Sequence, residues 1–355
     1  MKTKVRAVVV EDSLTVRKRI VEVLAHDPEL EVVGEAEDGK QGIELCLRLR
    51  PNVIVLDMML PLMSGLAVTE YIMAYSPTPI LIVSASLNRG EVFRTYEALA
   101  AGAVDVLEKP TGAEEDDEWD QRLVSTVKLV SKIRVITHPR ARLSSSAPQV
   151  AARPVRTPRG AGYGIVALGA STGGPGALVR VLNMLRPELP IPLVILLHID
   201  TAFGASIADW LDQQTPHRVS FPRDGEPVLE AAGRVVIAPP ARHLLVRDGR
   251  FRLTNDPERH SCRPSVDVLF ESIAREFAGR AIAGVLTGMG RDGALGLLAI
   301  RQAGGFTFAQ DEATSVVYGM PREAALVGAA EQILPLGDVG PTILELVSRK
   351  KGESP

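Results

Sequence analysis

The sequence predicts an α/β protein made of two successive doubly wound domains. Short apolar runs of strand character alternate with longer segments whose apolar residues recur at helical spacing, a pattern typical of parallel sheets covered by helices. This alternation stops over residues 137–162 and then resumes. A chain of 355 residues is also long enough for about two domains. We therefore expect an N-terminal domain, a linker and a C-terminal domain.

The N-terminal domain is expected to contain five strands that alternate with helices, a (βα)5 arrangement. Each expected strand is a short apolar run, and the segments between the runs have helical periodicity. Strands connected by helices in this way form a parallel sheet. The five runs lie at residues 6–12, 30–38, 52–60, 78–85 and 103–110.

Composition sets the boundaries of the two domains. We assign residues 1–125 to the N-terminal domain and expect its last helix to run to about residue 136. Residues 137–162 are rich in Pro, Ser, Ala and Arg and have no apolar period, which predicts a flexible linker. The C-terminal domain is assigned to residues 163–350.

The C-terminal domain is predicted to be a mostly parallel, doubly wound sheet with one antiparallel hairpin. Residues 243–254 interrupt the alternation, because two strand-like runs are joined there by Asp248-Gly249, a strong hairpin signal. The remaining strand candidates lie at residues 165–170, 192–199, 234–240, 282–288 and 305–310.

Charge and composition exclude several classes of function. A formal net charge of -3 gives no general attraction to nucleic acid or anionic lipid. The two cysteines, Cys46 and Cys262, lack the spacing of a zinc site or a disulfide framework. No apolar run approaches the roughly 20 residues that cross a bilayer. We expect a cytoplasmic protein with no nucleic acid partner and no direct membrane insertion.

Polar side chains follow the expected strands of the N-terminal domain at one edge of its sheet, where ligands bind in such folds. Three carboxylates gathered there repel each other unless a cation joins them, and oxygen ligands suit Mg²⁺. A solvated turn, or a cap formed by Asp12-Ser13 for a helix beginning at Leu14, is the alternative for the acidic pair. The residues at this edge are Glu11, Asp12, Asp57, Ser84 and Lys109.

This set, with Pro110 after the lysine, resembles the receiver domain of two-component response regulators, and the resemblance covers residues 4 to about 125. It implies a flavodoxin-like fold in which Asp57 is the phosphoacceptor. It also implies that Ser84 and Lys109 contact the phosphoryl group. The resemblance further implies that Mg²⁺ is held by Glu11, Asp12 and Asp57. One departure is Val106, which stands in the fifth strand where receivers commonly have the Tyr or Phe of the switch.

The stretch GASTGG, at residues 169–174, overlaps the end of the apolar run at 165–170 and has four interpretations. A dinucleotide-binding fingerprint would need glycine where Ser171 stands. A helix cap would explain the serine, and so would a phosphate-binding loop. A nucleophile would need a base within reach and a group that orients this base.

Two later strand ends supply such groups. His198 follows the run at residues 192–199, and Asp292 lies in a glycine-rich loop after the run at 282–288. If these strands are neighbours, His198 could act as the base and Asp292 could orient its ring. The other histidines remain candidates for the base, among them His217, His243 and His260.

The C-terminal half resembles the catalytic domain of the chemotaxis protein-glutamate methylesterases, the CheB family. The stretches that carry the resemblance are GASTGGPGAL, SCRPSVDVLFESIA, LTGMGRDGALG and AQDEATSVVYGMPREA. The resemblance implies that Ser171 is the nucleophile, His198 the base and Asp292 its orienting group. It also assigns an oxyanion contact to the backbone N–H of Met289. The family usually has Gln-His-Met-Pro around the histidine, whereas this sequence has Leu-His-Ile-Asp.

With a receiver in front, the resemblance implies a phosphorylation-regulated serine hydrolase. It would demethylate glutamyl methyl esters on methyl-accepting chemoreceptors, releasing methanol, and some members also deamidate glutamines. The phosphodonor would be a chemotaxis-type histidine kinase, and the receiver would act by covering the esterase edge until Asp57 is phosphorylated. Mg²⁺ would serve the receiver, and the esterase would need no cofactor. A non-catalytic, phosphorylation-controlled chemosensory interaction protein is the alternative.

Overall fold

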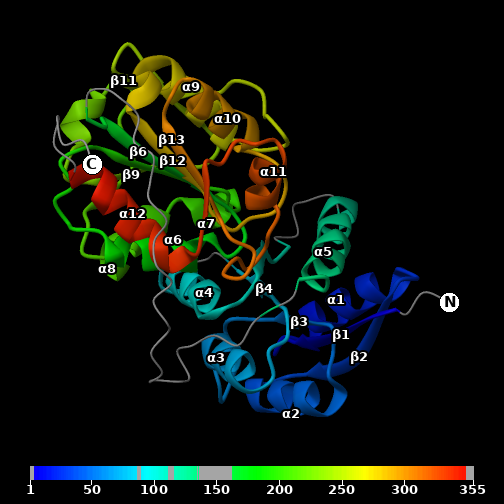
Figure 1. The fold of residues 1–355 in the computed structure, drawn as a ribbon. Helices are drawn as coiled ribbons and strands as arrows, with labels where there is room; N and C mark the ends of the chain where they lie inside the picture. Colours follow the sequence, from blue (N-terminus) through cyan, green and yellow to red (C-terminus); the bar gives the residue numbers. More distant parts are fainter. Residues whose placement is uncertain (1–3, 86–88, 111–115, 134, 136–161, 349–355) are drawn as a thin grey trace. The chain divides into compact units, whose positions relative to one another are not determined.

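A computed structural model describes residues 4–85, 89–110, 116–133, 135 and 162–348 of the chain (Figure 1). It divides the chain into two compact units, Met1–Ser146 and Ala147–Pro355. The predicted linker, residues 137–162, lies outside the described residues except for Gly162. In the described part of the chain, no helix has the length and apolar character needed to cross a membrane.

The first unit contains a parallel sheet whose described strands follow the order β2-β1-β3-β4-β5, which confirms the predicted (βα)5 arrangement. Helix α5 ends at Val130, before the limit near residue 136 that the sequence suggested. The elements are β1 (Val5–Val10), α1 (Leu14–His26), β2 (Leu30–Ala36), α2 (Gly39–Leu49), β3 (Val53–Leu56), α3 (Gly65–Tyr75), β4 (Ile80–Ser84), α4 (Arg89–Ala101), β5 (Asp105–Glu108) and α5 (Asp116–Val130).

The core of this unit holds the carboxyl ends of the strands in place. One face of β1, β3 and β4 packs against α1 and α5, with Val9, Val55, Leu24 and Leu123 buried between them. Burial of each such side chain contributes about 1.5–3 kcal/mol. The functional edge of the sheet therefore has a rigid support.

The second unit contains a sheet whose described strands follow the order β14-β13-β12-β6-β7-β9-β8, and every neighbouring pair is parallel. The hairpin β10–β11 forms a separate antiparallel sheet, as predicted. Its two turn residues, Asp248 and Gly249, both have positive φ, which a type I′ turn requires. The strands are β6 (Ile165–Ala170), β7 (Leu193–Leu197), β8 (Val219–Ser220), β9 (Val235–Ile237), β10 (His243–Arg247), β11 (Arg250–Thr254), β12 (Ala281–Val285), β13 (Phe306–Gln310) and β14 (Gln332–Leu334).

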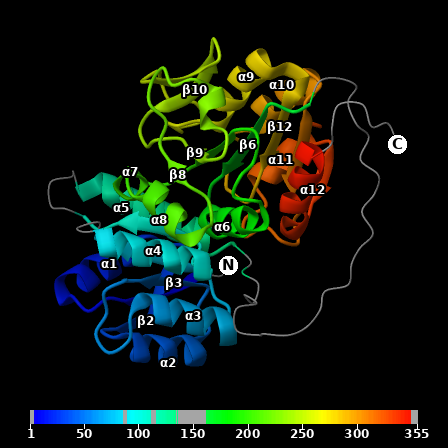
Figure 2. The ribbon, with the colours of Figure 1, turned by 90° about the vertical axis from the view of Figure 1, so that its left-hand side faces the viewer.

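Helices cover both faces of this sheet (Figures 1 and 2). Helices α9 and α10 pack with the hairpin on one face, where Ile165, Val194 and Phe270 belong to one buried cluster. Helix α12 packs against α6 on the other face. The helices are α6 (Gly174–Met184), α7 (Thr201–Gly204), α8 (Ile207–Gln214), α9 (Val266–Phe277), α10 (Ala294–Gln302), α11 (Met320–Leu326) and α12 (Leu336–Ser348), with the 3-10 turns η2 (Val228–Ala231) and η3 (Ala278–Arg280).

Candidate active site and phosphoacceptor cluster

Ser171 is the first residue after β6, the central strand of the second sheet. Its backbone N–H donates to the carbonyl of Thr287, which follows β12, at 3.0 Å. The Thr287 hydroxyl donates to the carbonyl of Thr172 at 2.9 Å, so the serine loop is tied to the neighbouring strand on both sides of Ser171. A side chain at Gly288 would place its Cβ 2.7 Å from the Cβ of Ser171, so the close approach of the two loops requires glycine there.

Ser171 does not cap a helix. Helix α6 begins at Gly174, and its N-cap is Gly173, in the left-handed region with φ 76°. The carbonyl of Ser171 accepts a hydrogen bond from the Gly174 N–H, at 2.7 Å. Within the described residues, the Ser171 hydroxyl makes no hydrogen bond. The half-buried hydroxyl is therefore not engaged as a helix cap.

His198 follows β7, which pairs with β6 in a register that sets Leu197 opposite Ala170. The N–H of His198 donates to the carbonyl of Ala170 at 2.9 Å. Ser171 and His198 therefore follow a paired position on strands that lie about 4.8 Å apart. In the described part of the structure, no hydrogen bond joins the two side chains.

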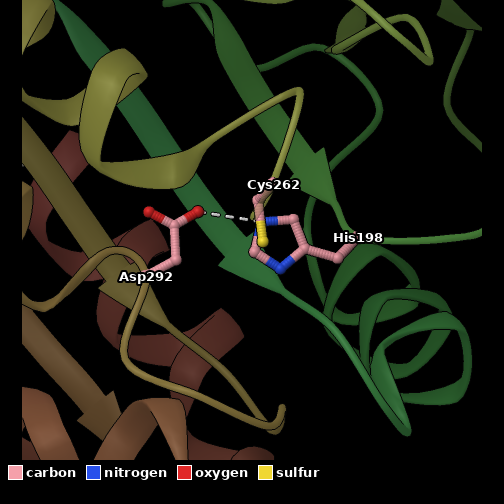
Figure 3. Close-up of side chains that lie close together, drawn as sticks. All are labelled: His198, Cys262 and Asp292. Carbon is pink, nitrogen blue, oxygen red and sulfur yellow. Dashed lines mark hydrogen bonds and ion pairs between the residues drawn. The ribbon is translucent and has the colours of Figure 1, made fainter. Parts of the chain in front are cut away.

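Asp292 contacts the imidazole directly. It lies in the loop after β12, on the other side of β6, and its Oδ2 is 2.9 Å from Nε2 of His198 (Figure 3). The carboxylate is almost fully buried, at 2% exposure. Nδ1 is therefore the imidazole nitrogen that does not contact Asp292.

Asp292 is held by a dense set of donors at the start of α9. Its Oδ1 accepts from the Ser265 hydroxyl at 2.7 Å and from the Asp267 N–H at 3.1 Å. Its Oδ2 accepts from the Val266 N–H at 2.7 Å. Ser265 in turn donates its N–H to Nδ1 of the buried His243 at 3.2 Å. Sequence reasoning missed this role of Ser265, although its place before an apolar helix marks it as a cap.

The other histidines are engaged elsewhere. His243 lies between the Ser265 N–H and the carbonyl of Pro257, and His217 contacts the carbonyl of Leu182. His260 contacts Asp267, at 3.0 Å. Of the four histidines weighed as the base, His198 is therefore the one that contacts Asp292 beside Ser171.

The buried pair is strongly polarised. Burial lowers the pKa of His198, but the hydrogen bond and charge of Asp292, together with the adjacent Cys262, outweigh it and raise the pKa to about 9. Burial raises the pKa of Asp292, yet the hydrogen bonds and charge around it, above all those of His198, hold it below its usual range. The carboxylate therefore stabilises the imidazolium form.

Cys262 is a residue of this site that sequence reasoning did not find. One ligand atom each from His198, Cys262 and Asp292 lies within 4.8 Å of the others, and the cysteine is half-buried. Figure 3 shows its sulfur beside the imidazole. The sequence feature that could have pointed to it is its position in SCRPSVD, four residues before α9, the helix whose first N–H groups donate to Asp292.

Met289 and Asp200 lie in the loops around the site. The backbone N–H of Met289 has no acceptor among the described residues. In the unusual Leu-His-Ile-Asp stretch, Asp200 is the N-cap of α7, since its Oδ1 accepts from the Ala202 N–H at 3.1 Å. The aspartate thus has a structural use at the start of α7.

The carboxylates of the first unit converge as predicted. One oxygen each of Glu11, Asp12 and Asp57 lies within 4.8 Å of the others. Nζ of Lys109 is 2.9 Å from Glu11 and 3.0 Å from Asp57. Burial, and next the charge of Asp57, raise the pKa of Glu11 to about 7 despite the lysine.

This cluster fits a divalent cation. Three carboxylates lie together, and two of them, Glu11 and Asp57, pair with the single ammonium of Lys109. Within the described residues, Oδ1 of the buried Asp57 has no hydrogen-bond partner. Such an all-oxygen set with an unsatisfied buried oxygen suits Mg²⁺. Asp12 is exposed and caps no helix, and its neighbour Ser13 makes no side-chain cap to α1. The capping interpretation of this pair is therefore wrong.

Two other predicted residues of the first unit have partners or are buried. The Ser84 hydroxyl donates to Oε1 of Glu91 at 2.9 Å rather than to a group of the carboxylate cluster. Val106 is buried in β5 opposite Ile82. A phosphoryl contact by Ser84 would therefore need its hydroxyl to turn away from Glu91.

Both halves of the chain match known families. Residues 166–343 match the family described as CheB methylesterase, and residues 7–116 match the response regulator receiver domain. A protein-glutamate methylesterase/protein-glutamine glutaminase of Nitrosospira multiformis is 39% identical over 99% of each chain. A second such protein, from Anaeromyxobacter dehalogenans, is 40% identical over 96% of this chain and 97% of its own. The crystal structure of the Thermotoga maritima CheB methylesterase catalytic domain is 34% identical, with a TM-score of 0.49, and covers 52% of this chain and 98% of its own.

Proposed function

The chain belongs to the CheB methylesterase family and carries a receiver domain, and from this premise we propose that it hydrolyses glutamyl methyl esters on methyl-accepting chemoreceptors. The observation that carries the proposal is the hydrogen bond between His198 and the buried Asp292, next to the strand that ends at Ser171. The names of the two relatives also support deamidation of receptor glutamines as a second reaction of the same site. The substrate lies on the cytoplasmic helices of receptors, so the protein acts in the cytoplasm.

The proposed reaction uses the free nitrogen of the imidazole. Ser171 attacks the ester carbonyl while Nδ1 of His198 accepts the hydroxyl proton, and Asp292 stabilises the imidazolium. The backbone N–H of Met289 donates to the oxyanion. Methanol leaves with the proton from His198, and water then attacks the acyl-enzyme to release glutamate and restore Ser171. With a glutamine substrate, the leaving group is ammonia.

The receiver is proposed to control this reaction through Asp57. A chemotaxis-type histidine kinase donates the phosphoryl group, and the ammonium of Lys109 is placed to contact it, 3.0 Å from the carboxylate of Asp57. Ser84 is proposed as the second contact. Phosphorylation adds a charge of about -1.5 to -2 to the buried edge, enough to rearrange a neighbouring surface.

The metal and domain assignments belong to the same proposal. Glu11, Asp12 and Asp57 would hold Mg²⁺, which supplies charge neutralisation for phosphoryl transfer when bound. The receiver is assigned to residues 1–125, the linker to 137–162 and the esterase to 163–350.

Methanol release from a methylated receptor tests the proposal. We expect the full chain to release methanol, faster with a small phosphodonor and Mg²⁺, and Ser171→Ala to release none above the blank. Asp57→Asn should keep the unstimulated rate and lose the response to the phosphodonor. No release by the unaltered chain, with receptor still bound, would instead favour a non-catalytic interaction protein.

A further inference from the structure

Residues Arg259 to Cys262 form a tight turn beside the imidazole. The N–H of Arg259 donates to the carbonyl of Cys262 at 3.2 Å, and the N–H of Cys262 donates back to Arg259 at 3.0 Å. The two central residues, His260 and Ser261, have φ of 53° and 58°. Two left-handed residues in succession define a type I′ turn, which normally takes glycine or asparagine. The conformation must therefore be enforced by its surroundings.

Helix α9 and the Asp292 loop supply this enforcement. Nε2 of His260 contacts Asp267 on α9 at 3.0 Å, and the guanidinium of Arg259 pairs with Glu271, one turn further along, at 2.7 Å. Nε of Arg291, next to Asp292, donates to Nδ1 of His260 at 3.3 Å. Both nitrogens of the His260 ring are thus engaged, and the turn is held on two sides.

The consequence of this anchoring is the position of the thiol. Sγ of Cys262 lies in the set of atoms within 4.8 Å that includes His198 and Asp292 (Figure 3). It also donates to the carbonyl of His260 at 3.4 Å. A protonated imidazole next to a thiol favours the thiolate, which is the reactive form of cysteine. Cys262 therefore lies beside the same ring that is proposed to serve Ser171.

Small reagents have a route to this thiol. Cys262 is half-buried rather than enclosed. The two residues before it, His260 and Ser261, line a surface hollow of about 630 Å³, together with Gly290, Arg291, Gly319 and Glu323. Cys262 therefore keeps some exposure to solvent, next to a hollow whose lining includes its two preceding residues but not Cys262 itself.

We propose that Cys262 is a modification site through which small thiol-reactive electrophiles arrest the hydrolase. The proposal rests on the proposed esterase function for its effect on activity, but the reactivity of the thiol does not. With an alkyl halide, the sulfur forms a bond to carbon and the carbon–halogen bond breaks. Halide leaves with the electron pair, and the thiol proton is released to solvent, while the imidazolium of His198 stabilises the attacking thiolate. The adduct occupies the space beside the imidazole and hinders substrate and proton transfer at the ring.

The other cysteine provides an internal control. Cys46 lies in α2 of the receiver unit, is fully buried, and has its thiol pKa raised to about 12 by burial. It should react slowly with any reagent in water. Alkylation of the folded chain is therefore expected at one position.

Iodoacetamide and the full chain test the proposal, with alkylation followed by peptide mass spectrometry. We expect one label, at Cys262, and loss of methanol release with the same rate constant as labelling. His198→Asn should slow labelling by about tenfold or more at neutral pH. Ser171→Ala, which keeps the imidazole, should be labelled at least as fast as the unaltered chain. Cys262→Ser should release methanol at the same rate before and after treatment with iodoacetamide. Cys46→Ser should be labelled and inactivated like the unaltered chain.

The proposal would be overturned if His198→Asn left the rate of Cys262 labelling unchanged, or if the labelled chain still released methanol at the full rate. Circular dichroism of each variant separates loss of the base from loss of the fold. Because labelling needs no turnover, a chain that releases no methanol would refute the proposed esterase while the alkylation rates still decide whether the thiol site exists.

Discussion

Replacing Asp292 by asparagine removes the charge of the buried carboxylate and keeps its shape. The aspartate accepts four hydrogen bonds, from His198, Ser265, Val266 and Asp267. An asparagine has one acceptor oxygen and a donor NH₂ group. In either orientation, at least one backbone N–H at the start of α9 faces the NH₂ group instead of an oxygen. An unsatisfied buried donor costs about 1–3 kcal/mol, so we expect a lower melting temperature.

The catalytic effect follows from the pKa of His198. Its rise from 6.5 to about 9 corresponds to about 3 kcal/mol of net stabilisation of the imidazolium, to which Asp292 and Cys262 both contribute. The imidazolium forms in the transition state when the ring takes the serine proton. We therefore expect Asp292→Asn to lower kcat by about 10² to 10⁴.

The pH dependence of kcat/KM makes this prediction specific. The base is the neutral imidazole, so the rate of the unaltered enzyme should rise with pH and level off above about 9. In Asp292→Asn the pKa of His198 should fall, which moves the rise to lower pH. The two enzymes must be compared on the plateau, where both imidazoles are neutral. The assay is methanol release from methylated receptor, corrected for spontaneous hydrolysis.

Asp267→Asn is the matched control, because Asp267 is an equally buried aspartate on α9 whose side chain contacts His260 and not His198. It should also lower the melting temperature but change kcat by no more than about threefold, less than 1 kcal/mol of barrier. The reasoning is refuted if Asp292→Asn stays within about tenfold of the unaltered enzyme on the plateau with the same pH profile.

Three further changes probe other parts of the account. Ser265→Ala removes the N-cap of α9 and a hydrogen-bond donor to Asp292. We expect thermal unfolding to show a loss of about 1 kcal/mol in the free energy of unfolding, and kcat to fall. An unchanged kcat would contradict the role of Ser265 in positioning the carboxylate. Gly288→Ala places a Cβ against Ser171, so it should lower the free energy of unfolding by about 1–3 kcal/mol and also lower kcat. Gly337→Ala, which has open space around it, should change neither quantity. Equal effects of the two variants would contradict the close approach of the two loops. Glu11→Gln should weaken Mg²⁺ binding by the full chain about tenfold in calorimetric titration, and equal affinity would exclude Glu11 as a ligand.

The fold could be predicted wherever a strand was long and fully apolar. The runs that became β6, β7 and β12 are buried throughout, and their order along the chain predicted a parallel sheet. The two edge strands, β8 and β14, were missed because they are only two and three residues long and only partly buried. Such short segments acquire strand geometry from the neighbour they pair with, which local sequence does not encode.

The candidate site was predictable to the extent that it lies at strand ends. Ser171 and His198 follow neighbouring strands, and Asp292 follows a third, so sheet topology brings their loops to one edge. Cys262 comes instead from a turn whose position depends on ion pairs with α9, and no periodicity reports such contacts. The family resemblance singled out His198 among the histidines, whereas strand positions alone left His217, His243 and His260 open until the hydrogen-bond partners of each ring were seen.

The most direct test of the serine mechanism is the identity of the acylated residue during turnover. Full-length enzyme is mixed with a methyl ester substrate, quenched in acid before turnover is complete, digested, and analysed by mass spectrometry. The account predicts an acyl adduct on Ser171, present in the unaltered enzyme and absent in Ser171→Ala. An adduct on Cys262, or methanol release with Ser171 replaced, would contradict it.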